Sequence, residues 1–298
     1  MSVKFKINKS IAKLRYLRRI NSYNTKEIKS IAIIFYIPKT NTLKYNNWED
    51  GFTKAVGILN TYFDVSWINL AEAKPTVETL NTFDFLIVKS CWDWIVDNYV
   101  RSLKGLKVPT GLAISCSKLP VNKNNIYAYD VLWFETNWYS ELVKQHSRAF
   151  HAFGINSSVF KFKETTKEYD VLSIGQLAAY KRHENILKLK GDKKLVIGDT
   201  NTKEGAEIKN FLNANNVEVI EFMNQDNLSY YINKSKLVYI PASINGGGER
   251  AVLEARSCGA EVLVEQDNPK LKELVTSQIW DENYYADRLK TGIFSILK

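Results

Sequence analysis

Cysteine is scarce in this sequence. Cys91, Cys116 and Cys258 are the only three among 298 residues, and their spacing matches no pattern of metal ligands. An odd and sparse set cannot build the disulfide framework on which small secreted domains rely, and it is typical of a reducing compartment. We therefore expect a cytoplasmic protein that is stabilised by its hydrophobic core, which a chain of this length can bury.

Long apolar runs are also absent. No stretch approaches the roughly 20 apolar residues that a membrane-spanning helix needs, and the N-terminus lacks the apolar core of a secretory signal. The sequence therefore predicts no helical membrane span. It leaves open a peripheral association with a membrane surface and, for a viral protein, the host cytoplasm as its location.

Acidic residues are nearly missing from the first 29 positions, where Glu27 is the only one. Nine cations against this one anion give the segment +8 of the formal net charge of +9. Ile7, Ile11, Leu14 and Leu17 recur there at helical spacing. Residues 1–29 are interpreted as a basic, partly helical arm. The arm is either a helix packed on the body with solvated lysines, or a functional arm for double-stranded DNA or an anionic membrane surface.

The sequence after the arm alternates between strands and helices, which predicts a mostly parallel sheet covered on both faces. Apolar runs predict strands at 30–38, 64–70, 83–90, 107–115, 129–136 and 148–154. Helical spacing predicts helices at 47–62, 93–105 and 138–146.

A polar stretch without periodicity, residues 157–168, precedes a second series of the same kind. Its predicted strands are 169–176, 194–200, 217–223, 236–242 and 261–265, and its predicted helices are 181–191, 205–216, 226–235 and 248–259. The pattern predicts an α/β protein with two similar doubly wound domains, residues 30–160 and 161–280, followed by a closing helix within 281–298.

Glycine is not abundant, with 14 residues, yet Gly246, Gly247 and Gly248 stand together between a strand and a helix. The N–H groups at a helix N-terminus attract anions, and glycine lets an anion approach the backbone. The run is either a phosphate cradle or a flexible turn before a core helix. It lacks the Lys-Ser/Thr of a P-loop, and residues 30–42 lack the glycines of a dinucleotide fingerprint, which disfavours an oxidoreductase.

The run GGGERAVLEARSCG (246–259) resembles the C-terminal signature of GT-B nucleotide-sugar glycosyltransferases, in particular glycosyltransferase family 4. That signature carries two glutamates eight positions apart. The second falls on Glu254, whereas the first falls on Gly246, which departs from the family pattern. Glu249 lies three residues further on and is a candidate substitute.

Two further segments support the resemblance. GINSSVF (154–160) is similar to the segment that ends the family's first domain, and YDVLSIGQLAAYKRHENIL (169–187) is similar to the one that follows. In the latter, the family's lysine falls on Lys181, while its arginine falls on Gln176. The match covers residues 148–275 well and the first domain only in outline.

The resemblance implies a GT-B fold, in which two Rossmann-like domains face a central cleft and the second domain binds the donor. It implies that Lys181, with Arg250 as a second cation, holds the donor diphosphate. The backbone of Gly246–Gly248 and the side chain of Gln176 would also contact the donor. Glu254 would accept hydrogen bonds from the ribose. Alternatively, Lys181 is a solvated lysine, and Arg250 and Glu254 form an ordinary pair on a helix surface.

On the acceptor side, Asp93 in KSCWDWIV (89–96) is a candidate catalytic residue, beside Glu249. Trp92 and Trp94 either stack on a ring of the acceptor or pack in the core. His151 either faces the cleft or is a core histidine. The family retains anomeric configuration without an evident protein nucleophile, and it needs no metal and no cofactor besides its donor, a UDP- or GDP-type nucleotide sugar.

The function expected from the resemblance is transfer of a sugar from a nucleotide sugar to a hydroxyl acceptor. We expect a hydroxymethylated base of DNA as the acceptor, since the arm is cationic and phage DNA glucosyltransferases share the GT-B fold. The Lys- and Asn-rich composition also hints at an AT-rich genome. The alternatives are a membrane-side glycan or lipid acceptor, and a non-catalytic nucleotide-sugar or nucleic-acid binding protein.

Overall fold

The computed structural model of the chain describes residues 3–23, 27–41, 48–90, 94–114 and 125–297. The chain folds into two compact units. The first unit contains residues 1–48, 52–153 and 283–298, and the second contains residues 49–51 and 154–282. The C-terminal helix thus returns to the unit in which the chain begins.

The first unit is built on a parallel sheet whose six described strands are ordered β2-β1-β3-β4-β5-β6. These are β1 (Ser30–Phe35), β2 (Asp64–Asn69), β3 (Phe85–Lys89), β4 (Thr110–Ala113), β5 (Val131–Phe134) and β6 (Ala149–His151). Each lies within a predicted strand. β1, β3, β4 and β5 are buried on both faces, as their apolar runs predict, whereas β2 and β6 at the two ends of the strand order are partly exposed.

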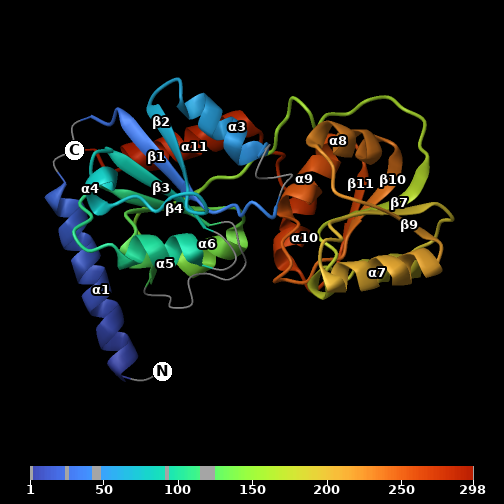
Figure 1. Cartoon of the computed structure of the whole chain (residues 1–298), viewed down its shortest axis with the longest axis horizontal. Coiled ribbons are helices and arrows are strands. Elements are labelled where there is room, and N and C mark those ends of the chain that lie inside the picture. The colour runs from blue at the N-terminus through green and yellow to red at the C-terminus, as the bar shows by residue number, and fades with distance from the viewer. Residues whose placement is uncertain (1–2, 24–26, 42–47, 91–93, 115–124, 298) are drawn as a thin grey trace. The chain divides into compact units, whose positions relative to one another are not determined.

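Helices cover both faces of this sheet (Figure 1). Ile31 and Ile33 of β1 pack with α3 (Gly51–Leu59) and α11 (Glu282–Phe294), whereas Ala32 and Ile34 pack on the opposite face. That face carries α5 (Ile95–Ser102) and α6 (Asn137–Val143). Alternate residues of a strand point to opposite faces, so β1 contributes to two cores. Two short elements, α4 (Val77–Leu80) and the 3₁₀ turn η1 (Asn125–Ala128), also belong to the unit.

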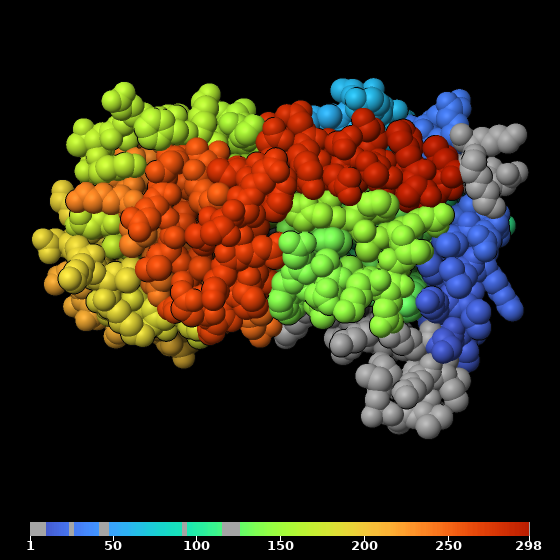
Figure 2. Space-filling view, turned by 180° about the vertical axis from the view of Figure 1, so that it is seen from behind, coloured from blue at the N-terminus to red at the C-terminus, as the bar shows by residue number. Residues whose placement is uncertain are grey.

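The C-terminal helix α11 is an integral part of the first unit, where Figure 2 shows it in red along the surface. Its buried side chains include Tyr285, Leu289 and Ile293. Trp133 of β5 is buried beneath it and donates a hydrogen bond from its indole nitrogen to the carbonyl oxygen of Arg288, at 3.1 Å.

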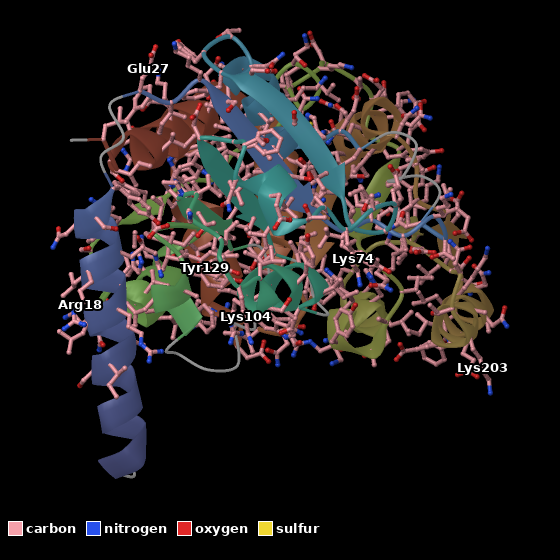
Figure 3. All side chains as sticks on the ribbon, turned by 60° about the vertical axis from the view of Figure 1, so that its left-hand side comes forward. Arg18, Glu27, Lys74, Lys104, Tyr129 and Lys203 are labelled. Atoms are coloured by element: carbon pink, nitrogen blue, oxygen red, sulfur yellow. The ribbon has the colours of Figure 1, made fainter. Side chains whose placement is uncertain are left out.

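The predicted basic arm contains helix α1 (Val3–Ser22). Tyr16 and Ile20 are buried in the core of the first unit, while Arg18 is exposed and points outward (Figure 3). Figure 1 shows the first turns of the helix extending beyond the rest of the unit. One end of the arm is therefore packed on the body, as one of the two sequence interpretations expected.

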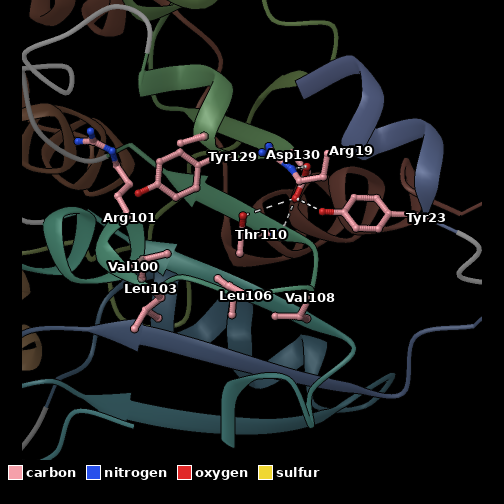
Figure 4. Close-up of a pocket in the computed structure, with 11 residues that line it drawn as sticks. Arg19, Tyr23, Val100, Arg101, Leu103, Leu106, Val108, Thr110, Tyr129 and Asp130 are labelled. Carbon is pink, nitrogen blue, oxygen red and sulfur yellow. Dashed lines mark hydrogen bonds and ion pairs between the residues drawn. The ribbon is translucent and has the colours of Figure 1, made fainter. Parts of the chain in front are cut away.

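An ionic cluster anchors the end of α1 (Figure 4). Arg19 Nε lies 2.8 Å from Asp130 Oδ1, and the Tyr23 hydroxyl donates to Asp130 Oδ2 at 3.0 Å. The backbone N–H of Thr110 donates to the same oxygen at 2.8 Å. A cavity of about 230 Å³ lies beside this cluster, with apolar side chains such as Leu106 in its wall.

The second unit contains a parallel sheet whose five described strands are ordered β11-β10-β7-β8-β9. They are β7 (Tyr169–Ile174), β8 (Lys194–Ile197), β9 (Val217–Ile220), β10 (Ser235–Ile240) and β11 (Glu261–Val264). Its helices are α7 (Lys203–Ala214), α8 (Gln225–Asn233), α9 (Glu249–Ser257) and α10 (Pro269–Thr276). The predicted α/β fold with two doubly wound domains is confirmed.

One predicted helix of the second unit is wrong. Residues 181–191 form no α-helix, because the segment divides into two 3₁₀ turns, η2 (Ala179–Lys181) and η3 (His183–Lys188). Arg182 between them adopts a left-handed conformation, with φ at 54°, which interrupts a helix. Its guanidinium group compensates by bonding Pro241 O at 2.8 Å and both carboxylate oxygens of Asp267.

Helix α10 was not predicted. It is a short helix of eight residues that begins with Pro269, a residue that suits the first turn because its missing N–H has no acceptor there. None of the described helices is long and apolar enough to cross a membrane.

Candidate functional site

The strand order of the second unit reverses between β7 and β10. From β7 the chain proceeds outward through β8 and β9, and it then returns to place β10 on the other side of β7. Open α/β sheets bind ligands outside the carboxyl ends of their strands at such a switch point. The two segments that follow β7 and β10 contain Lys181 and the three glycines, so the strand order brings these predicted site residues to one edge.

The two segments are bonded directly to each other. The N–H of Ser243, which follows β10, donates to the carbonyl oxygen of Tyr180 at 2.9 Å. The side chain of Asn268 in turn donates to the carbonyl oxygens of Ala242 and Ser243, at 2.9 and 3.0 Å. The start of α10, which follows β11, is thereby attached to the same edge.

Lys181 packs its aliphatic stem over Gly175. A β-carbon on Gly175 would lie 3.4 Å from Cδ and Cε of Lys181, which is van der Waals contact with the stem. Burial is the main cause that lowers the pKa of Lys181, to about 8, with Lys270 and Arg250 adding repulsion and Glu249 opposing them. No described residue accepts a hydrogen bond from its ammonium group.

Gly247 leaves space beside that ammonium group. A β-carbon on Gly247 would lie 3.8 Å from Lys181 Nζ and 3.5 Å from Glu249 Oε2. Gly247 also adopts φ of 64°, which glycine reaches most easily. Gly248 differs from it, because a β-carbon there would come within 2.8 Å of the Ile240 side chain. Of these two glycines, only Gly247 therefore borders the space that Lys181 faces.

Gly246, where the family has its first glutamate, sits in a tight turn. Its N–H donates to Ser243 O at 2.7 Å, and a β-carbon would lie 2.9 Å from Tyr180 O and 3.0 Å from the Ala242 side chain. Contacts this short to backbone are not relieved by a side-chain rotation. A glutamate at 246 does not fit this backbone, which gives a physical reason for the departure from the family signature.

Glu249, at the first position of α9, is the carboxylate beside the glycines. Its Oε1 lies 2.5 Å from Lys270 Nζ, and both side chains are buried. Its Oε2 faces Gly247. Lys270 belongs to α10, which the sequence did not predict, and sequence reasoning missed this residue.

Glu254 lies one turn further along α9 and is buried. Burial raises the pKa of its carboxyl group to about 7, with Asp50 adding to the rise and Arg250 opposing it. No described residue donates a hydrogen bond to this carboxyl group. Neither the ammonium group of Lys181 nor the carboxyl group of Glu254 is among the fully enclosed polar atoms, so both groups remain accessible to a ligand, and their shifted pKa values are typical of functional sites.

Arg250 is partly exposed at the start of α9. Its Nη1 bonds Asp50 Oδ2 at 2.6 Å, and Asp50 is itself buried. The alternative of an ordinary surface pair between Arg250 and Glu254 does not describe this arrangement, because Glu254 is buried and the carboxylate that Arg250 bonds belongs to Asp50.

Gln176, in the place of the family's arginine, accepts a hydrogen bond on Oε1 from the Tyr180 hydroxyl, at 2.7 Å. The nearby His183 is fully buried between Ser173 Oγ, at 2.9 Å, and the carbonyl oxygen of Gln176, at 3.2 Å. Burial lowers the pKa of His183 to about 4, and the charge of Lys181 adds to this. His183 is therefore a structural support of the segment that carries Lys181.

The acceptor-side candidates are described only in part. Asp93, Trp92, Cys91 and Cys116 lie outside the described residues, whereas Trp94 stands immediately before α5. His151 is bonded to the Tyr284 hydroxyl at 3.0 Å and to Glu135 O at 3.1 Å, and burial lowers its pKa to about 4. These contacts match a packed histidine.

Comparison with known proteins finds a family match for the half of the chain that contains the candidate site. The family of glycosyl transferases group 1 matches residues 155–298, which include the whole site apart from Asp50. None of the curated proteins compared with the chain matches its sequence.

Solved structures share the fold across nearly the whole chain. Alr3699/HepE of Anabaena, in complex with UDP and glucose, is 11% identical, with a TM-score of 0.60 and 90% of each chain covered. Sucrose-phosphate synthase of Thermosynechococcus elongatus is 12% identical, with a TM-score of 0.60 and 90% of each chain covered. A glycosyltransferase of Rickettsia africae is 10% identical, with a TM-score of 0.58, covering 91% of this chain and 89% of its own.

The resemblance inferred from the signature is thereby confirmed. Residues 155–298, just under half of the chain, match the family of glycosyl transferases group 1, and the chain has the GT-B fold of the solved glycosyltransferases.

Proposed function

We propose that this glycosyltransferase binds a UDP-type nucleotide sugar at the carboxyl edge of β7 and β10 and transfers its sugar, with retention, to a hydroxyl acceptor. One observation carries the proposal: Lys181 and Glu254 present an ammonium and a carboxyl group to which no described residue is hydrogen-bonded. The binding of UDP and of UDP-glucose by HepE supports a uridine nucleotide as the first donor to test.

The charges of the site suit a diphosphate. Lys181 has no acceptor for its ammonium group in the part of the chain that the structure describes, and it lies beside Gly247 and the first turn of α9. The first N–H groups of a helix have no acceptor within the helix and carry partial positive charge. As the bond to the sugar breaks, the leaving diphosphate gains negative charge, and fixed cations and N–H groups lower the free energy of that state.

Glu254 and Glu249 suit the other parts of the donor. In the proposed role, Glu254 accepts hydrogen bonds from the ribose hydroxyls, since its buried carboxyl group has no other donor among the described residues. Glu249, with Oε2 toward Gly247, takes over sugar recognition from the carboxylate that is absent at Gly246. Arg250 contributes positive charge at the rim while it remains bonded to Asp50.

The experiment that tests the donor site is transfer of labelled glucose from UDP-glucose, and of mannose from GDP-mannose, by Lys181→Ala and Glu254→Ala. Both variants should lose transfer while their thermal unfolding remains cooperative, and Glu254→Gln, which keeps the shape, serves as the conservative control. Wild-type turnover in both alanine variants would contradict the proposal. The anomeric configuration of the product tests retention.

For the acceptor, we propose a hydroxymethylated base of DNA, supported by the cationic side chains of α1. Lys13, Arg15 and Arg18 are exposed on this helix, and exposed cations bind duplex phosphates. Incorporation of labelled sugar into hydroxymethylated DNA tests this acceptor directly.

A second acceptor class, a membrane-side glycan or lipid, is favoured by a different observation on α1. The side chains of Ile11 and Leu14 are 42% and 55% exposed among the cations. Exposed apolar and cationic side chains on one helix also fit an anionic membrane surface. Sedimentation with anionic vesicles distinguishes this class from DNA.

A further inference from the structure

Lys270 is a lysine without any solvent exposure, located in the first turn of α10. Lysine is almost never fully buried unless its charge is paired. Here the ammonium group bonds Glu249 Oε1 at 2.5 Å. The pair joins the first turns of two neighbouring helices at the edge where the donor is proposed to bind.

Stability alone does not account for such a pair. Desolvation of two charges costs about as much as their attraction returns, and well-packed apolar residues of similar volume are often equally stable or better. The neighbouring position 271 shows that this region accepts apolar packing, since Leu271 is fully buried. The contribution of the pair to the free energy of folding does not explain its presence, whereas a role in orienting the Glu249 carboxylate does.

The two carboxylate oxygens of Glu249 have different surroundings. Lys270 occupies Oε1, whereas Oε2 is directed to the space over Gly247 that Lys181 Nζ also faces. A carboxylate held at one oxygen keeps the other in a fixed direction. The anchor is itself fixed, because Asn268 bonds the start of α10 to the carbonyl oxygens of Ala242 and Ser243.

We infer that Lys270 is a positioning residue for recognition of the donor sugar. It holds Oε1 of Glu249, so that Oε2 accepts a hydrogen bond from a hydroxyl group of the sugar. The tight turn at Gly246 does not accommodate a glutamate, and the Glu249–Lys270 pair supplies a carboxylate from the first residue of α9 instead. This inference rests on the proposed donor site. It adds a residue that orients the carboxylate which binds the sugar of the donor.

The test compares binding of UDP with binding of UDP-glucose by titration calorimetry, in the full chain and in Lys270→Met. The two ligands share the nucleotide and differ by the sugar. We expect the variant to bind UDP within about twofold of wild type and to lose about 10- to 100-fold in affinity for UDP-glucose, the range for a hydrogen bond to a charged group. Glu249→Gln should show the same selective loss, and Lys272→Met, an exposed neighbour on α10, should show none.

A charge-swapped variant, Glu249→Lys with Lys270→Glu, guards against a simple folding defect. It keeps an ion pair at the same place, so it should unfold near the wild-type temperature, yet it presents an ammonium group where the sugar needs an acceptor. We expect it to bind UDP-glucose no more tightly than Lys270→Met does. Wild-type affinity for UDP-glucose in the swapped variant would overturn the inference.

Two other results would also contradict the positioning role of Lys270. If Lys270→Met binds UDP-glucose as wild type does, or loses UDP to the same degree, Lys270 does not position a sugar ligand and the inference is wrong. If the wild-type protein binds neither uridine nor guanosine diphosphates and their sugars, the proposed donor site fails and the inference fails with it. The wild-type titration thus separates the two failures.

Discussion

Lys181 and Glu249 face one space, and Gly247 keeps it open: a β-carbon at position 247 would lie 3.8 Å from the ammonium nitrogen and 3.5 Å from a carboxylate oxygen. The two residues come from segments that follow different strands, β7 and β10, at the switch point of the sheet. An ammonium group and a carboxylate are thus brought beside a backbone without a side chain.

The first prediction concerns that space. Gly247→Ala should weaken UDP-glucose binding at least tenfold, because its methyl group occupies the space between Lys181 and Glu249. The change also forces alanine into a left-handed conformation, which costs about 1–2 kcal/mol. Gly105→Ala is the matched control, since Gly105 has φ of 88° in the first unit with its nearest neighbour at 3.9 Å. Equal loss of UDP-glucose binding in both variants would mean that strain, not occupation of the site, is responsible.

The pH dependence of kcat/KM should be a bell, because this quantity reports the ionisations of the free enzyme. Protonated Lys181 attracts the diphosphate, and its pKa is lowered to about 8, so activity should decline above pH 8. Ionised Glu254 is the better acceptor for ribose hydroxyls, and its pKa is raised to about 7, so activity should decline below pH 7.

Two variants test which group forms each limb of the bell. Asp50→Asn should move only the acidic limb to lower pH, because the charge of Asp50 raises the pKa of Glu254 and is not among the causes acting on Lys181. Arg250→Gln should move both limbs to higher pH, since Arg250 lowers the pKa of both groups. An acidic limb that stays in place in both variants would exclude Glu254 as its origin.

Much of the fold was accessible from the sequence, because buried parallel strands read as apolar runs. β1, β3, β7 and β10 each begin and end within a few residues of their predicted bounds. The conformation of residues 181–191 was not accessible, since the helix is interrupted at Arg182, which has a left-handed backbone and bonds Asp267, 85 positions away. Hydrogen bonds to residues far along the chain cannot be predicted from the local sequence.

The residues of the candidate site likewise differ in whether the sequence indicated them. The spacing of a family signature made Lys181 and Glu254 candidates, and the structure adds that no described residue is hydrogen-bonded to either group. Lys270 could not be identified, because its meaning comes from contact with Glu249, 21 positions away, across two helices. The order of strands, which selects the edge between β7 and β10, is likewise a property of the packed sheet and not of any one segment.

The third prediction is a loss of stability in acid that depends on His183. Its pKa is about 4 in the folded protein and about 6.5 in an unfolded chain, so between these values the unfolded state binds more protons. The free energy of unfolding should therefore fall as pH drops from 6.5 to 4, by about 3 kcal/mol for this group at most. Urea unfolding at pH 7 and pH 4.5 measures the change.

The control is His183→Gln, which cannot gain this proton and should lose less stability than wild type between the two pH values. His151→Gln should behave in the same way, because the pKa of His151 is also about 4. If wild type and His183→Gln lose the same amount, His183 does not remain neutral in the folded protein.

The last prediction concerns the outward face of α1 and depends on the DNA acceptor proposed above. Replacing Lys13, Arg15 and Arg18 by glutamine should lower the slope of log Kd against log salt for duplex binding by about 3, since each cation that contacts a phosphate contributes about 0.9. These side chains are exposed, so the free energy of unfolding should change little. Titration of a duplex at several salt concentrations measures the slope.

The matched control removes the same number of charges elsewhere, by glutamine substitution at Lys74, Lys104 and Lys203, which are exposed and do not belong to α1 (Figure 3). This variant should keep the wild-type slope, because a general effect of net charge would lower both slopes alike. If α1 and control variants change equally, α1 is not the binding surface. If the wild-type protein shows no salt-dependent duplex binding but sediments with anionic vesicles, Ile11 and Leu14 become the relevant side chains of α1, and the acceptor is to be sought on the membrane.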